Sequence, residues 1–354
     1  MHAKYILPVA AAQAVLGQSL VDVLTSQNHT LSTLIGLIQQ QPQLLSTLGG
    51  LQDITVLAPS NDAFGKLLSD PAVASAVQTQ PGLVPALLTY HVLNGTFYSS
   101  QLIGASNPVF PPTLLTNTTY STISGGQRVE VKGQDGTVAI FSGNGAEAKV
   151  QAADFNFTGG TVHIIDSVLS IPGNLTDVLT FNNLTSLAGA VTQANLVQPL
   201  TNLAELTLFA PNNDAFAAIS DVAANLTVEQ LTGVLGYHVI PGAVVYSADI
   251  TNGATVATLQ GTNVTLRIQD GAVFVNNAKV VKADVLVKNG VVHVIDSVLI
   301  PNATATPTGT GSSPSSTASA TGVSTVVPGA AASMGQGVVG AVALFAGVVA
   351  LLNM

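Results

Sequence analysis

The sequence predicts an α+β protein made of two tandem copies of one structural unit, and three observations support this fold class. Sequence motifs recur in the same order in two halves of the chain. Within each half, apolar residues first follow the spacing of amphipathic helices and later alternate as in strands, which is typical of segregated helices and sheets. The chain has 354 residues, of which 47% are hydrophobic, so about two domains can each bury a core.

Three motifs define the repeat. Residues 55–64 read TVLAPSNDAF, and residues 207–216 read TLFAPNNDAF. Tyr90-His91 recurs as Tyr237-His238, and a His-x-x-Asp motif occurs at 163–166 and again at 293–296. The lead-in Asp-Val-Leu-Thr precedes both copies, at 22–25 and 177–180. Motifs in the same order indicate an internal duplication, with the first unit at residues 18–172 and the second at 173–301.

The two copies differ in length after the first motif. From Pro59 to His163 the chain advances 104 residues, whereas from Pro211 to His293 it advances 82. The 22 additional residues of the first copy divide into 5 before the Tyr-His pair and 17 after it. The join between the copies, residues 171–174, is very short, so we expect restricted motion between them.

Each copy is expected to begin with helices. Residues 20–40 and 175–194 carry apolar side chains at helical spacing. Residues 55–57 and 207–209 predict short strands that stop at Ala-Pro, after which Ser60 or Asn212 caps a helix. Asp62 and Asp214 fall in the first turn, where the helix dipole favours negative charge. Residues 83–93 and 228–240 predict helices that end near the Tyr-His pairs.

The later part of each copy predicts strands, because short β-rich runs are separated by Asp-Gly turns. In the first copy the expected strands are 119–123, 128–132, 138–141 and 150–153. In the second copy they are 264–268, 272–275, 278–283 and 291–299.

The two ends of the chain predict export and attachment to a surface. Residues 1–17 combine Lys4, an apolar run and a small-residue cleavage pattern, which indicates a signal peptide; a buried first helix is the alternative. Residues 302–330 form a Ser/Thr/Pro/Gly-rich stalk. Residues 331–354 end in an apolar tail shorter than the about 20 residues of a membrane span, which predicts a glycosylphosphatidylinositol (GPI) signal with attachment near Ser324, Gly329 or Ala330. A retained transmembrane anchor is the alternative.

Composition excludes several classes of function. Only 8% of residues are charged and the net charge is −9, so nucleic acid is not an expected partner. The chain has no cysteine, which excludes thiolate catalysis, disulfides and thiolate zinc sites.

Asn-x-Thr sequons are candidates for N-glycosylation. They lie at Asn28, Asn94, Asn117, Asn156, Asn174, Asn183, Asn225, Asn263 and Asn302.

The two motif boxes and the Tyr-His pairs resemble those of the fasciclin domain family, over nearly all of residues 18–301. The resemblance implies two tandem domains, each a β-wedge or sandwich with packed helices, in an extracellular or GPI-anchored surface protein. The Ala-, Thr- and Ser-rich tail and the weakly basic signal resemble those of fungal members. The residues that match the family motifs, in structural or adhesive roles, are Pro59, Asn61, Asp62, Phe64, Tyr90, His91, His163, Asp166, Pro211, Asn213, Asp214, Phe216, Tyr237, His238, His293 and Asp296.

The histidines are the residues with most chemical potential. His163 with Asp166 could serve a hydrolase as base and orienting carboxylate, but residues three apart on a strand point to opposite faces. We therefore expect buried polar groups that hold the layers together, with no catalytic residue, metal ligand or cofactor site. In some animal members of the family the Tyr-His region contributes to integrin-dependent adhesion, a role that the resemblance would place at Tyr90-His91 and Tyr237-His238. Core packing is the alternative role for these pairs.

Three functions remain open from the sequence. The first is a non-enzymatic cell-surface protein that mediates adhesion or organises matrix or cell wall, with proteins, glycans or copies of itself as partners. The second is a secreted hydrolase that uses the His-x-x-Asp pairs. The third is a carrier of apolar ligands or a surface sensor. The expected location is the plasma membrane, through a lipid anchor, or the cell wall, with the vacuole as the alternative.

Overall fold

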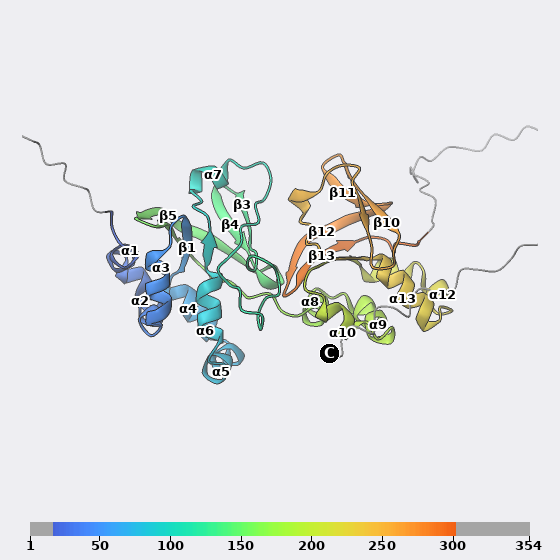
Figure 1. Ribbon diagram of the computed structural model, residues 1–354, viewed down its shortest axis with the longest axis horizontal. Helices are drawn as coiled ribbons and strands as arrows, with labels where there is room; N and C mark the ends of the chain where they lie inside the picture. The colour runs from blue at the N-terminus through green and yellow to red at the C-terminus, as the bar shows by residue number, and fades with distance from the viewer. Residues whose placement is uncertain (1–16, 302–354) are drawn as a thin grey trace, which may run out of the picture. The chain divides into compact units, whose positions relative to one another are not determined.

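The computed structural model describes residues 17–301 (Figure 1). The predicted signal peptide, apart from its last residue, lies outside the described residues. So do the stalk, the apolar tail, Asn302 and the attachment candidates Ser324, Gly329 and Ala330.

The first repeat, residues 18–172, forms one six-stranded sheet with helices before and between its strands. Its helices are α1 (Leu20–Ser26), α2 (Asn28–Gln39), α3 (Pro42–Gly50), α4 (Asn61–Leu68), α5 (Pro71–Thr79), α6 (Leu83–Tyr90), α7 (Ser99–Ile103) and the 3₁₀ turn η1 (Gly143–Gly145). Its strands are β1 (Ile54–Pro59), β2 (Val92–Asn94), β3 (Glu130–Gln134), β4 (Thr137–Phe141), β5 (Glu147–Phe157) and β6 (Gly160–Ile165). The sheet order is β2-β1-β6-β5-β4-β3, with β1 parallel to β6 and the other neighbours antiparallel.

The second repeat, residues 173–301, has the same topology with one more edge strand. Its helices are α8 (Leu175–Phe181), α9 (Thr185–Gln193), α10 (Val197–Asn202), α11 (Asn213–Ala217), α12 (Ser220–Ala223), α13 (Val228–Tyr237) and the 3₁₀ turn η2 (Ser247–Asp249). Its strands are β7 (Leu206–Pro211), β8 (Val239–Pro241), β9 (Thr255–Ala257), β10 (Asn263–Gln269), β11 (Ala272–Val275), β12 (Ala278–Val287) and β13 (Gly290–Ile295). The order is β8-β7-β13-β12-β11-β10-β9, and β7 lies parallel to β13. The predicted α+β class with two tandem units is confirmed.

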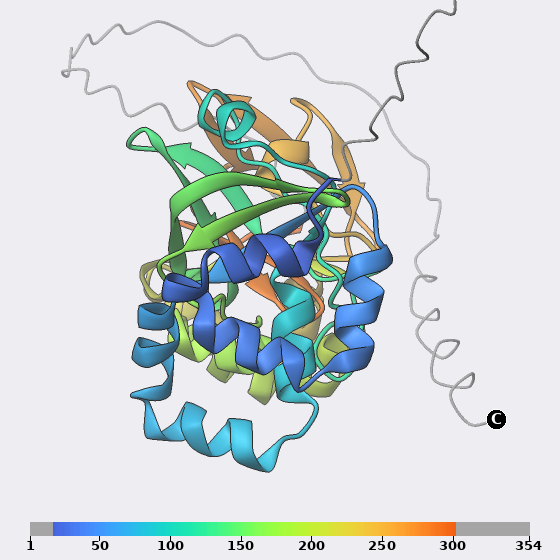
Figure 2. The ribbon, with the colours of Figure 1, turned by 90° about the vertical axis from the view of Figure 1, so that its left-hand side faces the viewer.

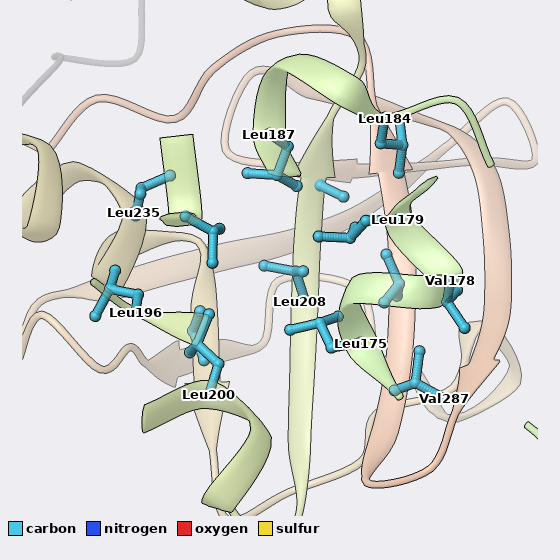
Figure 3. Close-up of a cluster of buried hydrophobic side chains, with 14 of the residues drawn as sticks. Leu175, Val178, Leu179, Leu184, Leu187, Leu196, Leu200, Leu208, Leu235 and Val287 are labelled. Atoms are coloured by element: carbon cyan, nitrogen blue, oxygen red, sulfur yellow. The ribbon is translucent and has the colours of Figure 1, made fainter. Parts of the chain in front are cut away.

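Each sheet buries both of its faces, because strand residues alternate between two apolar clusters. In β1, Ile54 and Val56 pack against the N-terminal helices, which gather on one side of the strands (Figure 2), while Leu57 packs into the opposite cluster. The second repeat repeats this division, with Leu208 of β7 among the leucines of α8 and α9 (Figure 3). The central strands β1, β6, β7 and β13 are therefore almost wholly buried.

Four predicted helices have other bounds in the structure. The predicted helix 20–40 is broken at Gln27 into α1 and α2, and the predicted helix 175–194 is broken around Asn183, whose φ of 56° is left-handed. The helices predicted over 83–93 and 228–240 end at Tyr90 and Tyr237, since the residues after the following histidines pair as strands β2 and β8.

The predicted strand 119–123 is wrong. Asn117 folds this segment into a turn. Its side-chain Oδ1 accepts a hydrogen bond from Thr119 N at 2.9 Å, and its carbonyl accepts from Tyr120 N and Ser121 N, both at 2.9 Å. Other strands exist with shifted ends: 128–132 begins at Glu130, 291–299 ends at Ile295, and 150–153 and 278–283 extend into β5 and β12.

Candidate functional site

The imidazole of His163, in β6, holds the loop that follows β2. Its Nε2–H donates to the carbonyl of Phe97 at 2.7 Å, and its Nδ1 accepts from the amide of Asp154 at 3.1 Å. Thr55, on the adjacent strand β1, donates to Gly95 O at 2.8 Å and accepts from Phe97 N at 2.9 Å. Two buried side chains on neighbouring strands therefore fix one loop by its backbone, and we name this group the loop clasp.

The second repeat builds the same loop clasp. His293 Nε2–H donates to Val245 O at 2.8 Å, and Nδ1 accepts from Asp284 N at 3.3 Å. Thr207 donates to Ala243 O and accepts from Val245 N, both at 2.9 Å. The duplication has preserved the whole hydrogen-bonded group as well as its sequence motif.

Asp154 and Asp284 complete the loop clasps, and the sequence analysis missed both. Each has a left-handed backbone, with φ of 63° and 60°, at an irregularity in β5 or β12. Their carboxylates accept backbone hydrogen bonds from Ser99 N at 3.0 Å and Ser247 N at 2.8 Å. Both aspartates lie nine residues before the histidine that they contact. That shared spacing is the signal that could have identified them.

His91 and His238 form a second repeated contact, at the end of α6 and of α13. In each, Nδ1–H donates to the carbonyl four residues earlier, at 2.7 Å to Leu87 and 2.8 Å to Val234. In each, Nε2 accepts a hydrogen bond from a backbone amide in the segment that follows the central strand. The donor to His91 is Leu169 N at 2.9 Å, and the donor to His238 is Leu299 N at 2.8 Å. These rings therefore join a helix end to the exit of the sheet.

All four imidazoles are held in the neutral form. Each uses one nitrogen as donor and one as acceptor, so a second proton would face a backbone N–H. Burial lowers the pKa of His91 and of His238 from 6.5 to about 4, because the charged ring would lose its water. Burial also lowers the pKa of His163 and of His293, although a neighbouring aspartate opposes the shift in both.

Asp166 and Asp296 do not meet the histidines of their own motifs. Asp166 Oδ1 accepts from Lys149 N at 2.8 Å, and Asp296 Oδ1 accepts from Lys279 N at 2.9 Å, so each carboxylate extends the pairing of a strand end. His163 is 2% exposed and His293 is 1% exposed. The arrangement of base and orienting carboxylate that the hydrolase hypothesis requires is not formed by these pairs.

The remaining motif residues support the backbone at equivalent places in both repeats. Asn61 Oδ1 accepts from Thr33 N at 2.9 Å, and Asn213 Oδ1 accepts from Ser186 N at 3.0 Å, which ties each helix start to an earlier helix. Pro59, Pro211 and Phe64 are buried, Phe216 is half-buried, and Asp62 and Asp214 are exposed in first turns.

The tyrosines of the Tyr-His pairs are buried as well. Tyr90 is 0% exposed and donates to Arg128 O at 3.0 Å, and Tyr237 is 5% exposed and donates to Asn263 O at 3.0 Å. Neither pair presents its side chains to a partner in this conformation.

Residues 17–301 contain neither a candidate metal centre nor a candidate membrane-spanning helix. No group of three or more His, Asp or Glu side chains within this range is placed to hold a metal ion. No helix in the same range is both long and apolar enough to cross a bilayer.

Direct contacts join the two repeats. Gln127, fully buried, donates from Nε2 to Val287 O at 3.2 Å, and Thr122 donates from Oγ1 to Ala204 O at 2.7 Å. Phe110 stacks on Tyr246 with ring centroids 4.3 Å apart. Polar and aromatic contacts of this kind link the two repeats.

The sequons within the described residues are all accessible. Their asparagine side chains are exposed at Asn28, Asn94, Asn117, Asn156, Asn174, Asn183, Asn225 and Asn263. None would have to leave the core to accept a glycan.

Comparison with known proteins agrees with this duplicated architecture. The fasciclin domain matches residues 29–172 and 182–301, which together are more than half of the chain. The chain therefore belongs to the fasciclin domain family, as the sequence motifs predict.

Several relatives are similar over most of the chain. A fasciclin-like arabinogalactan protein of Arthroderma benhamiae is 31% identical over 278 residues, 78% of this chain and 65% of the relative. The fasciclin-like arabinogalactan protein elcF of Phaeosphaeria nodorum is 33% identical over 284 residues, 79% of this chain and 88% of the relative. A solved domain pair from the insect cell adhesion molecule fasciclin I is 20% identical with a TM-score of 0.38, and the match covers 78% of this chain and 98% of that one.

Proposed function

We propose that this protein is a non-enzymatic adhesion protein of the cell surface that organises matrix or cell wall through its two fasciclin domains. One observation carries the proposal: in both repeats the histidines bind backbone atoms in the interior. Side chains used in this way stabilise a fixed shape, and they are not free to transfer protons to a substrate. A fixed surface presented twice is suited to contact with partners.

The direct contacts between the repeats support this role. Ser124 N donates to Glu205 Oε1 at 2.9 Å, and Thr122 N donates to Lys288 O at 3.2 Å, in addition to the bonds of Gln127. Two modules fixed relative to one another lose little freedom when both bind one partner. Many copies on one surface would then add weak contacts into strong adhesion.

Export and anchoring belong to the same proposal. Exposed sequons, the signal-like residues 1–17 and the terminal apolar run are the features that support it. Treatment of intact cells with phosphatidylinositol-specific phospholipase C should release the protein from a retained GPI anchor. Protein that stays on the cells and also resists wall-degrading enzymes would contradict the proposed anchoring.

The adhesive role is tested by deletion and display. Cells that lack the protein should aggregate less, bind less to matrix-coated surfaces and have weaker walls than cells that display it. The double variant Asp166→Asn, Asp296→Asn is the matched control, because the amide oxygen can still accept the two backbone hydrogen bonds while a catalytic carboxylate would be lost. We expect the control to restore adhesion fully. Unchanged phenotypes on deletion would overturn the proposal, and failure of a folded Asn variant would favour the hydrolase.

A further inference from the structure

A cavity of about 570 Å³ lies where the two repeats meet. The first repeat contributes Phe110 and Arg128, and the second contributes Glu205, Tyr246 and Asp249. This volume falls within the range of about 300–1,000 Å³ that is usual for small-molecule sites. The walls come from two domains, as at many binding sites.

Two residues that line the cavity each carry a buried polar atom with no hydrogen-bond partner among residues 17–301. One is Nε of Arg128, whose Nη1 already donates to Phe110 O at 2.9 Å. The other is the hydroxyl of Tyr246, a side chain that is only 5% exposed. Burial raises the pKa of Tyr246, so its hydroxyl stays protonated and available as a donor. Neither atom has exposed surface in this conformation, so a ligand in the cavity would accept from it only after a turn of the side chain. Because buried donors are almost always paired, such a pairing would remove an unfavourable feature of the structure.

Carboxylate groups that can accept hydrogen bonds also line the cavity. Glu205 is half-buried and uses one carboxylate oxygen to accept from Ser124 N, and Asp249 is exposed on the same cavity. Phe110 and Tyr246 add a pair of stacked aromatic rings. The cavity therefore offers donors, carboxylate acceptors and an aromatic surface within reach of one molecule.

The charges select the class of ligand. Two carboxylates against one guanidinium disfavour an anion. A cation without acceptor atoms would leave the Arg128 and Tyr246 donors unpaired. An apolar ligand would leave the buried donors unpaired. A neutral molecule with several hydroxyl groups satisfies both sets, because a hydroxyl accepts from Arg128 or Tyr246 and donates to a carboxylate.

We propose that this inter-repeat cavity binds a neutral saccharide of about two sugar rings. After a turn of each side chain toward the cavity, the Arg128 Nε–H and Tyr246 O–H donate to its hydroxyl oxygens. Its hydroxyl hydrogens reach Glu205 and Asp249, and a C–H face packs on Phe110. Because the site joins both repeats, the saccharide also stabilises their contact. The inference does not depend on the adhesive role, which other surfaces of the protein could supply.

The test uses the full secreted protein, treated with endoglycosidase so that its own glycans cannot compete. Neutral gluco-, manno- and galacto-oligosaccharides of two to four rings are titrated by calorimetry and by thermal shift, beside a galacturonic acid oligomer and a fatty acid. We expect at least one neutral oligosaccharide to bind and to raise the melting temperature. The expected effect of Tyr246→Phe is a tenfold or greater loss of affinity with no loss of stability, since the hydroxyl has no partner to lose.

Two further variants make the result decisive. Arg128→Gln should also weaken the neutral saccharide at least tenfold, whereas Tyr98→Phe, an exposed tyrosine that does not line the cavity, should leave binding unchanged. Absence of binding by every neutral oligosaccharide at millimolar concentration would mean that water alone fills the cavity, and would overturn the proposal. Preferred binding of the acidic oligomer or the fatty acid, or binding that survives Tyr246→Phe, would overturn it equally.

Discussion

Acid should unfold this protein through its buried neutral histidines. The folded pKa of His91 and of His238 is about 4, whereas an unfolded histidine titrates near 6.5. As the pH falls, the unfolded chain therefore binds protons before the folded chain does. The contribution of these histidines to the free energy of unfolding is fully present above pH 6.5 and is lost as the pH falls to about 4. A difference of about 2.5 pKa units corresponds to roughly 3 kcal/mol for each ring.

The loss is large relative to the stability of a typical domain. At pH 5 the linkage relation gives a loss of about 2 kcal/mol per ring, or about 4 kcal/mol for both, against a usual total of about 5–15 kcal/mol. The lowered pKa of His163 and of His293 adds to the loss. The raised pKa of Glu130 acts in the opposite direction, because its protonation favours the folded state.

Urea unfolding at pH 8, 6, 5 and 4.5, followed by circular dichroism, measures this slope directly. His91→Gln should be less stable than the unmutated protein at pH 8. Between pH 6 and 4.5 its free energy of unfolding should fall less steeply with pH, by up to about 1.4 kcal/mol per pH unit. His29→Gln is the matched control, because His29 is exposed. A free energy of unfolding that stays flat between pH 8 and 5, or a His91→Gln variant with the full slope, would refute the reasoning.

Two further perturbations test the interface and the sheet. Gln127→Ala should lower the free energy of unfolding by about 1–3 kcal/mol and split thermal unfolding into separate transitions, because the Val287 carbonyl loses the hydrogen bond from Gln127. Gln193→Ala, at an exposed position, should do neither. A single unshifted transition in the Gln127 variant would contradict the role of this contact. Gly160→Ala should cost at least about 3 kcal/mol in urea unfolding, since an added Cβ would lie 1.8 Å from the Ile54 carbonyl at a φ of 154°. Gly36→Ala, in an open helical position, should instead gain about 0.5–1 kcal/mol, and equal effects of the two substitutions would show that the close approach is relieved at little cost.

The features that sequence analysis predicted correctly are local ones. The helix that starts after Ser60 is predictable because the cap lies within one turn, and the amide of Ala63 does donate to Ser60 Oγ at 3.2 Å. The helix that ends beside Tyr90 is predictable from the apolar spacing of the residues before it. The duplication is predictable because the same local patterns occur twice.

Partners of the histidines could not be predicted, because they are backbone atoms far along the chain. His163 binds the carbonyl of Phe97, 66 residues earlier, and His91 accepts from Leu169, 78 residues later. A backbone amide or carbonyl is present at every position, so no residue type marks the partner. The sequence indicated buried polar groups at these sites, and only the fold shows which loops they fix.

The inter-repeat cavity was missed for a different reason. Arg128 and Tyr246 lie outside the repeated motifs, so the duplication does not draw attention to them. Arg128 is one of only two arginines in the chain, and that scarcity is a signal that could have singled it out. Arg128 and Tyr246 line one cavity because of how the two repeats pack, which no local pattern encodes.

The unequal length of the repeats explains how a duplicated domain makes a single, closed contact. Between the Tyr-His pair and His163 the first repeat is 17 residues longer than the second, and this region supplies Phe110, Thr122 and Gln127 to the interface. Two identical repeats in head-to-tail contact would leave the same surfaces free at both ends, and such contacts propagate into open filaments. Because the second repeat lacks the longer segment, it cannot bind a third domain in the way that it is bound by the first. The asymmetry thus limits this contact to the pair.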